Sequence, residues 1–405
     1  MTTFLVDNEL VYTYDTLQKD ISNTDSYYQR YRTDNLYNFF LNIIRALLAN
    51  KPITLIDSDL NDSEIEGIDY DQINRPFKIK CFGQLSMDSI VNLIKESSSE
   101  IEIFTSGTTG QPKKVTHSID NLTRTVRLSN QYKEHVWGFA YNPTHMAGLQ
   151  VFFQALLNNN TIINLFNKER KFIYQAIDQY SITHISATPT FYRLLLPIEN
   201  SYSSVRRITL GGEKSDSNLY SSILEIFPKA KINNIYASTE AGSLFAASGE
   251  NFRIPLSVKE KIIVEEGELL IHKSLLGKSD SFVFNGEYYH TGDLIEWVDK
   301  EEGLFRFKSR KNELVNVGGY KVNPSEVEEA ISQIPGVLQV LVYGKESSVL
   351  GNILCAQIKQ DKKGSLSEVT IRTFLSDKIQ DYKIPRMIKF VESISLTRTG
   401  KIKRI

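Results

Sequence analysis

The sequence is poor in cysteine, since its 405 residues include only Cys81 and Cys355. Two thiols this far apart in the chain have no metal-ligand spacing and give no basis for a disulfide framework. We therefore expect two reduced thiols in a cytoplasmic protein. The N-terminus lacks a basic segment followed by an apolar run, so we expect no secretory signal.

Long hydrophobic runs and an excess of charge are also missing. The most apolar stretch, residues 36–48, contains Asn42 and Arg45 and is too short to span a bilayer. Its apolar spacing predicts an amphipathic helix packed on a core, and we expect no membrane insertion. The formal net charge of −1 creates no broad field for nucleic acid. A hydrophobic share of 41% in a chain of this length suits about two or three globular domains.

Strand and helix patterns alternate between residues 101 and 240, which predicts a mainly parallel sheet covered by helices. The strands are expected at residues 101–104, 136–141, 161–165, 183–187, 205–210 and 231–236, and the helices at 118–132, 149–157, 169–180 and 215–227. Ser118 is the expected N-cap of the first of these helices.

The pattern changes after residue 240, where short β-rich segments alternate with Gly and Asp turns. We predict an α/β fold with two domains. Residues 1–311 are expected to form a large N-terminal domain of mixed and parallel sheets with helices, together with a small antiparallel β subdomain. Residues 312–405 are expected to form a small mobile α+β C-terminal domain. Its helices are predicted at 325–332 and 369–378, and its strands at 337–343, 353–358 and 387–391.

A loop rich in hydroxyl groups and glycine, Thr-Ser-Gly-Thr-Thr-Gly-Gln-Pro-Lys, occupies residues 105–113 directly after a predicted strand. Glycine allows tight backbone geometry, and the hydroxyl and N–H groups can donate to a polyphosphate. The Gly-Lys-Ser/Thr of a Walker A loop is absent. A polar surface loop is the alternative, which six hydroxyl or glycine positions in a row behind a strand make less favoured. The residues expected to contact phosphate are Thr105, Ser106, Gly107, Thr108, Thr109 and Lys113.

This loop resembles the phosphate-binding signature of the adenylate-forming (AMP-binding) superfamily, which includes acyl-CoA synthetases, adenylation domains of peptide synthetases and luciferase. Further motifs of the family follow in its order. They are Tyr-Ala-Ser-Thr-Glu at 236–240, Tyr-His-Thr-Gly-Asp at 289–293, Ser-Arg at 309–310 with Val-Gly-Gly-Tyr-Lys at 317–321, and Thr-Arg-Thr-Gly-Lys at 397–401. Coincidence is a poor explanation for such an ordered set.

The resemblance implies roles in nucleotide binding for several residues. It implies that Tyr236 stacks on adenine, that Glu240 holds Mg²⁺, and that Asp293 binds the ribose hydroxyls. The other ATP or AMP contacts that it implies are Gly211, Gly212, Glu213, Ser238, Thr239 and Arg310. Taken singly, Tyr236 could be a core aromatic, Glu240 a surface carboxylate and Asp293 a turn residue.

The resemblance also implies catalytic and conformational roles. Lys401 is expected to be the catalytic lysine of the last motif, although it also belongs to a basic tail. His145 falls where the family has a residue that lines the acyl pocket, and a structural histidine is the plainer alternative. Asn312 corresponds to the hinge between the domains. Gly318 and Gly319 correspond to a tunnel that admits a thiol.

The implied reaction is that of an acyl- or aryl-CoA synthetase. A small carboxylic acid and ATP with Mg²⁺ give an acyl-adenylate and pyrophosphate, and coenzyme A then gives a thioester and AMP. Two alternatives stay open. One is an enzyme that loads a separate acyl carrier protein or forms an amide, and the other is a nucleotide-binding relative without turnover. No feature of the sequence specifies an oligomeric state.

Overall fold

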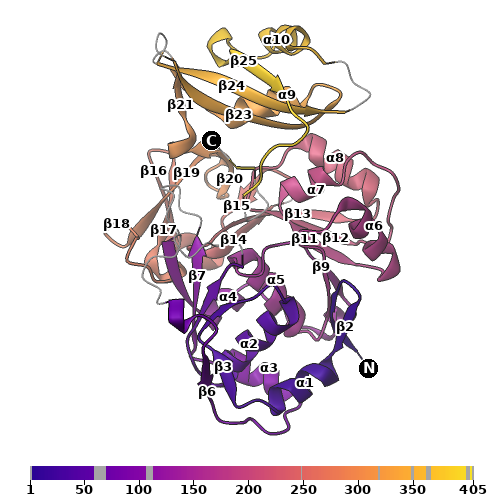
Figure 1. The fold of residues 1–405 in the computed structure, drawn as a ribbon. Coiled ribbons are helices and arrows are strands. Elements are labelled where there is room, and N and C mark those ends of the chain that lie inside the picture. The colour runs from indigo at the N-terminus through magenta and orange to yellow at the C-terminus, as the bar shows by residue number, and fades with distance from the viewer. Residues whose placement is uncertain are drawn as a thin grey trace.

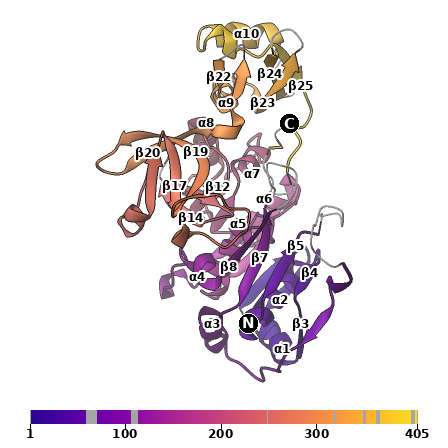
Figure 2. The same cartoon turned by 90° about the vertical axis from the view of Figure 1, so that its left-hand side faces the viewer.

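The computed structural model describes residues 2–58, 70–105, 113–247, 249–317, 320–347, 351–361, 366–397 and 402–403. A large N-terminal body carries a small C-terminal domain on one end (Figures 1 and 2). Within the described ranges, every helix is too short or too polar to cross a membrane.

The centre of the body is an eight-stranded sheet with the order β14-β13-β12-β11-β9-β10-β1-β2. The strands from β1 to β13 along this order are parallel, and β2 and β14 are antiparallel edge strands. Their bounds are β1 (Thr3–Asp7), β2 (Leu10–Thr13), β9 (Val136–Phe139), β10 (Thr161–Asn164), β11 (His184–Ala187), β12 (Arg207–Gly211), β13 (Lys231–Ser238) and β14 (Gly242–Ala247). The predicted parallel sheet is confirmed, and the sequence missed β1 and β2.

Helices cover both faces of this sheet. Successive residues of a strand point to opposite faces, so each face has its own buried core. Ile162 belongs to a core cluster with Phe40 and Phe152, whose rings stack at 4.2 Å. Ile163 belongs to a second cluster with Ile177. The helices are α1 (Tyr14–Ser22), α2 (Leu36–Leu48), α3 (Met87–Lys95), α4 (Ile119–Thr123), α5 (Met146–Leu156), α6 (Arg170–Gln179), α7 (Pro189–Leu194) and α8 (Ser217–Ile226).

A second sheet, β4-β5-β7-β8, lies beside the first in the N-terminal body. Its strands are β4 (Arg30–Arg32), β5 (Ile53–Ile56), β7 (Glu100–Thr105) and β8 (Lys113–Ser118), and β3 (Ser26–Tyr28) pairs separately with β6 (Pro76–Lys78). Strands β7 and β8 are antiparallel partners, so residues 106–112 connect two paired strands.

The helix expected from Ser118 to residue 132 is much shorter than predicted. Ser118 does cap it, but α4 ends at Thr123. Arg124 follows at once, and its guanidinium donates to the carbonyl oxygens of Ala241 at 3.3 Å and Leu275 at 3.0 Å. These long-range contacts anchor the chain where helix propensity alone would continue the helix.

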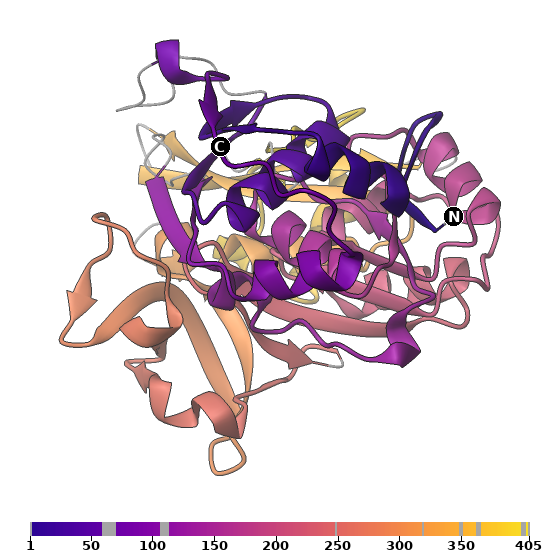
Figure 3. The ribbon, with the colours of Figure 1, turned by 90° about the horizontal axis from the view of Figure 1, so that it is seen from below.

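The predicted antiparallel subdomain is confirmed as a six-stranded sheet that projects to one side of the body (Figure 3). The order is β15-β20-β19-β17-β16, and β18 pairs with β19. The bounds are β15 (Phe252–Arg253), β16 (Ile262–Glu265), β17 (Glu268–His272), β18 (Phe284–Asn285), β19 (Tyr288–Asp299) and β20 (Leu304–Arg310).

The C-terminal domain is a small α+β unit with a core of its own, which includes Val327, Val342 and Leu375. Its elements are β21 (Val315–Val317), β22 (Tyr320–Val322), α9 (Pro324–Ser332), β23 (Val337–Ser347), β24 (Gly351–Gln360), α10 (Glu368–Ser376) and β25 (Met387–Phe390). The predicted domain boundary after residue 311 stays a prediction.

Polar contacts join this domain to the body. Lys214 pairs with Glu329 of α9 at 2.8 Å, and the Asn218 amide donates to the Ser332 carbonyl oxygen at 3.3 Å. The backbone N–H of Ile402 donates to Glu213 Oε1 at 2.9 Å. The C-terminal segment therefore reaches the carboxyl ends of the strands in the large sheet.

Candidate active site

Two of the predicted segments meet at the carboxyl ends of neighbouring strands of the eight-stranded sheet. Gly211 ends β12, and Ser238 ends the adjacent strand β13. Ligands of open α/β sheets bind outside this edge. The strand register therefore brings the segments after residues 211 and 238 together, although they lie apart in the sequence.

Asp293 is the centre of a polar cluster beside this edge. Its Oδ2 accepts a hydrogen bond from the Tyr236 hydroxyl at 2.6 Å, and its Oδ1 accepts one from Arg310 Nε at 2.6 Å. The Asp293 charge is the main cause that raises the pKa of Arg310. Burial, with Asp293 nearby, raises the pKa of Tyr236. Tyr236 and Arg310, which belong to two other motifs, thus meet at the carboxylate of Asp293. Asp293 itself is 5% exposed.

The ring of Tyr236 is fixed by other aromatic rings. Phe307 stacks on it with centroids 4.5 Å apart, and Phe245 lies at 5.5 Å. Both neighbours connect Tyr236 to the core of the antiparallel subdomain. Its stacking on adenine stays a prediction.

Glu268 supports the irregular part of strand β19 that carries Asp293, and the sequence motifs did not reveal it. Its Oε2 accepts from Lys311 Nζ at 2.6 Å and contacts His290 Nδ1 at 3.0 Å, and its Oε1 accepts from the Gly292 N–H at 2.8 Å. Burial alone would raise the pKa of Glu268, but these hydrogen bonds lower it. Gly292 has φ +74°, a conformation that favours glycine, and it lies where the pairing of β17 with β19 shifts register, so Glu268 holds this irregularity of the strand.

Glu240 and Lys113 line a small hollow of about 30 Å³ together with Tyr289. The Glu240 carboxylate has no hydrogen bond or ion pair with the residues that the structure describes. No group of three or more His, Cys, Asp or Glu among those residues could hold a metal by itself. A single free carboxylate fits Mg²⁺, which takes few protein ligands when phosphate oxygens supply the others.

His117 fixes the turn that presents Glu240, and it too was missed from the sequence. Its Nε2 lies 2.8 Å from the carbonyl oxygen of Thr239, and the residue is 1% exposed. Burial lowers the pKa of His117 to about 4, so the ring is neutral at pH 7. Ser238 Oγ accepts from the Ala241 N–H at 3.1 Å. The hydroxyl and the imidazole therefore hold both sides of the turn.

Glu213 links the two domains at this edge. Its Oε2 accepts from the Thr190 N–H at 3.0 Å, and its Oε1 accepts from the Ile402 N–H. Before it, Gly212 has φ +84°, and a Cβ on Gly211 would lie 3.1 Å from the Tyr141 hydroxyl. This turn therefore requires glycine on geometric grounds, whatever it binds.

His145 lies at the N-cap of α5, in a buried polar group on the same body. Its Nε2 is 3.7 Å from Asp57 Oδ2, which also accepts from the Asn142 amide at 2.6 Å. A Cβ on Gly148 would lie 2.3 Å from the Asn142 carbonyl oxygen, so this residue must be glycine. Asp57 was not a predicted site residue because no motif marks it.

Several predicted residues fall outside what the structure describes. Thr105 ends β7, but its side chain is not described, nor is that of Asn312 in the short helix Lys311–Glu313. Seven further predicted residues lie wholly outside the described part of the chain: Ser106, Gly107, Thr108, Thr109, Gly318, Gly319 and Lys401.

Two protein-family models match parts of this chain. "AMP-binding enzyme" matches residues 63–262, and "AMP-binding enzyme C-terminal domain" matches residues 326–401. A 2-succinylbenzoate–CoA ligase of Listeria monocytogenes is 26% identical, over 75% of this chain and 68% of that protein. Gramicidin S synthase 2 of Brevibacillus brevis is 27% identical over 75% of this chain, but the match covers 8% of that protein.

A solved structure shares the fold over nearly the whole chain. The o-succinylbenzoate CoA synthetase of Bacillus subtilis, in complex with its acyl-adenylate intermediate, superposes with a TM-score of 0.72 at 18% identity. The match covers 99% of this chain and 94% of that one. The resemblance seen in the sequence motifs is confirmed, and the chain belongs to the family of AMP-binding, adenylate-forming enzymes.

Proposed function

We propose that this enzyme activates a small carboxylic acid with ATP and transfers the acyl group to coenzyme A. In the first step the carboxylate attacks the α-phosphorus of ATP, forming an acyl-adenylate and releasing pyrophosphate. In the second step the thiol attacks the acyl carbon, forming a thioester and releasing AMP. The observation that carries this proposal is the Tyr236–Asp293–Arg310 cluster, at the same edge where the C-terminal segment meets Glu213.

Asp293 is suited to bind the ribose of the nucleotide. Each carboxylate oxygen has two acceptor positions, so its bonds to Tyr236 and Arg310 leave capacity for two ribose hydroxyls. The ion pair with Arg310 holds the Asp293 carboxylate in place, and hydrogen bonds to a carboxylate are stronger than those to a neutral acceptor. Glu268 holds this part of strand β19 in place through the Gly292 N–H and acts as a positioning residue.

The phosphate end of the site is assigned to the loop at residues 105–113, to Glu240 and to Lys401. Mg²⁺ held through Glu240 would neutralise phosphate charge during the attack. Lys113 and Lys401 supply positive charge that offsets the charge building up as two anions approach. No general base is required, since a carboxylic acid is already ionised at pH 7.

His145 and the neighbouring Asp57 are assigned to the acyl side of the site. Asp57 Oδ2 lies 3.7 Å from the His145 imidazole, and both side chains are largely buried. The small domain is then proposed to turn about Asn312 after adenylation, which exchanges Lys401 for the Gly318–Gly319 surface and admits the thiol.

A separate acyl carrier protein is the second candidate acceptor. The match to gramicidin S synthase 2 supports a carrier protein as an alternative acceptor, because a related sequence occurs within that peptide synthetase.

Two free thiols, Cys81 and Cys355, support a cytoplasmic location.

The test is a pyrophosphate-release assay with the purified chain, ATP, Mg²⁺ and a panel of aliphatic and aromatic acids. We expect release with a subset of the acids, and AMP and an acyl-CoA by mass spectrometry once coenzyme A is added. Asp293→Ala is the control, which should strongly reduce release at ATP concentrations that do not saturate the variant. Pyrophosphate release that never leads to a thioester with coenzyme A would redirect the second step to a carrier protein or an amine. ATP binding without release for any acid would identify a nucleotide-binding relative without turnover.

A further inference from the structure

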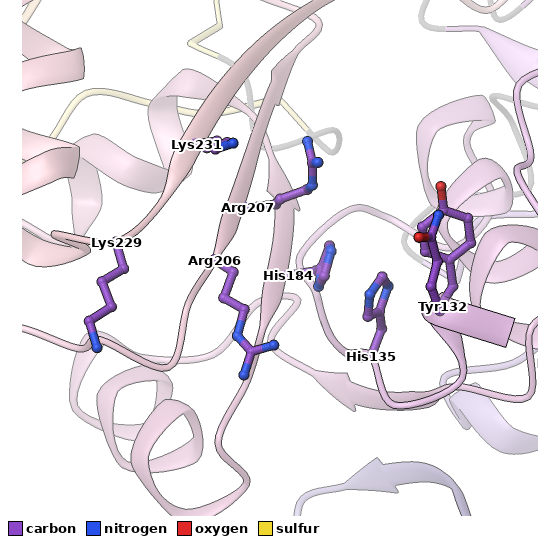
Figure 4. A pocket seen from close by; sticks show the side chains of 8 residues that line it. Tyr132, His135, His184, Arg206, Arg207, Lys229 and Lys231 are labelled. Carbon is purple, nitrogen blue, oxygen red and sulfur yellow. The ribbon is translucent and has the colours of Figure 1, made fainter. Parts of the chain in front are cut away.

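A basic hollow lies at the amino edge of the eight-stranded sheet, opposite the candidate active site. Its volume is about 460 Å³. Figure 4 shows its side chains, with the rings of His135 and His184 side by side between Arg207 and Tyr132. The lining residues are Gln131, Tyr132, His135, His184, Arg206, Arg207, Lys229 and Lys231. Strand β12, whose five residues span about 15 Å, separates this edge from the active-site edge.

The strand register creates this cluster. His184 pairs with Arg207, and Arg207 pairs in turn with Lys231, as the first residues of three adjacent parallel strands. Arg206 and Lys229 lie just before two of these strands and add two more cations. Like charges directly opposite each other on neighbouring strands destabilise a sheet, so this edge carries an electrostatic cost.

No carboxylate compensates these cations among the described residues. Arg206, Arg207, Lys229 and Lys231 are exposed, and none of them forms an ion pair or side-chain hydrogen bond there. Some exposed arginines elsewhere do form ion pairs, as Arg253–Glu302 at 2.7 Å and Arg306–Glu296 at 2.9 Å show. Four free cations around one hollow create a field that concentrates anions.

Neutral rings form one wall of the hollow. The rings of His135 and His184 stack with centroids 3.9 Å apart, and Tyr132 lies 5.3 Å from His135. Burial, followed by His135 and the two arginines, lowers the pKa of His184 to about 3. Burial and the same arginines lower the pKa of His135. The wall is therefore uncharged at pH 7, and the positive charge comes from the four flexible cations.

We propose that this hollow is a second ligand site, for a compound that carries two or more adjacent phosphate groups. One phosphate needs about one bidentate arginine, whereas four cations match the charge of a polyphosphate. The volume suits a small ligand rather than a single ion. The site is independent of the proposed adenylation, because none of its residues belongs to the Asp293 cluster or the Glu213 turn.

Calorimetric titration of the full chain with inorganic tripolyphosphate, without Mg²⁺ and at about 0.05 M salt, tests the proposal. The chain offers two matched double variants. Lys229→Gln/Lys231→Gln removes two cations of the hollow. Lys259→Gln/Lys261→Gln removes two exposed cations with the same spacing elsewhere. We expect affinity to fall about tenfold or more in the first variant and to stay at the wild-type value in the second.

A second measurement locates the ligand without altering the hollow. Trp137 lies 4.8 Å from His184, and the sequence has one other tryptophan, Trp297. In a Trp297→Phe background, tripolyphosphate should change the emission of Trp137. Equal affinities in both double variants together with unchanged Trp137 emission would overturn the proposal, because any binding would then belong to the active site.

Two further binding experiments distinguish the possible sources of the phosphate groups. Sedimentation with phosphatidylcholine vesicles containing phosphatidylinositol 4,5-bisphosphate, lost in Lys229→Gln/Lys231→Gln, would support the site and assign a lipid headgroup. Tripolyphosphate binding without vesicle binding would support it and assign a free phosphate compound. Binding of single-stranded RNA with no binding of tripolyphosphate would reject it in favour of a nucleic-acid surface.

Discussion

At the carboxyl edge of the eight-stranded sheet most of the described charged groups have partners, whereas at the amino edge four cations stand together without a partner among the residues that the structure describes. Asp293 is held by Tyr236 and Arg310, and Glu213 accepts from two backbone N–H groups. Glu240 is the exception at the carboxyl edge, since its carboxylate has no hydrogen-bond or ion-pair partner in the described part of the chain.

The comparison separates charges that organise the protein from charges that are free to meet a ligand. A paired and buried group such as Asp293 contributes to the fold and is already oriented for binding. Glu240 and the amino-edge cations have opposite signs, and the partners proposed for them differ accordingly, a metal cation at one edge and a phosphate-rich anion at the other. The following predictions test this separation.

The largest effect is expected at the paired carboxylate. Asp293→Ala should weaken ATP binding about 100-fold, because two charge-assisted hydrogen bonds to the ribose are lost, each contributing about 1.5–3 kcal/mol. Calorimetry with ATP measures the loss. Asp293→Asn is the control that keeps the shape, and thermal melting must show that Arg310 without its partner leaves the fold intact. Unchanged ATP affinity in a folded Asp293→Ala variant would remove Asp293 from the site.

The buried histidine of the carboxyl edge should make stability depend on pH. The pKa of His117 is about 4 in the folded chain against 6.5 for the free side chain. The unfolded chain therefore binds more protons between these values, and stability falls as pH drops from about 6.5 towards 4. One histidine contributes up to about 1.4 kcal/mol per pH unit in this window. Urea unfolding of wild type and His117→Gln should show a smaller slope in the variant, and equal slopes would contradict the assignment.

The contact between the domains should matter less. Glu213→Gln keeps an acceptor for the Ile402 N–H but loses the charge, which we expect to slow adenylation about tenfold. Thioester formation from preformed acyl-adenylate should change little, since the small domain is proposed to turn away in that step. An equal loss in both half-reactions would show that Glu213 acts on the fold and not on the domain arrangement.

The smallest effect is expected at the unpaired edge. Lys231→Gln relieves repulsion with Arg207 and should stabilise the chain by a few tenths of a kcal/mol at low salt, with the gain vanishing as salt is added. Lys261→Gln is the matched control. A lower melting temperature in Lys231→Gln alone would show that Lys231 stabilises the sheet edge or a nearby helix terminus.

The sequence predicted most of the fold because its strands and helices carry strong local periodicity. The strands at β9 to β13 and the helices α5, α6 and α8 match their predicted ranges closely. Strands β1 and β2 were missed, because β1 completes the sheet by pairing with β10, more than 150 residues away. Such a pairing leaves no local pattern beyond a short apolar run.

The candidate site was predictable where residues recur in ordered motifs. Tyr236, Asp293 and Arg310 were named from those motifs, and the structure brings them together. Glu268 and His117 were not, because they act on motif residues through tertiary hydrogen bonds. The amino-edge cations belong to no motif either, since only the lateral register of parallel strands makes them neighbours.

The few polar contacts between the domains have a consequence for the timing of the two half-reactions. The Lys214–Glu329 pair is exposed, with 41% and 40% of the side chains accessible, and such pairs contribute about 0–1 kcal/mol. The Asn218–Ser332, Asn323–Lys308 and Glu213–Ile402 hydrogen bonds add about another few kcal/mol. A ligand whose affinity for the two arrangements differs by about 100-fold shifts their balance by about 2.8 kcal/mol. The chemical state of the bound nucleotide can therefore set which domain arrangement predominates.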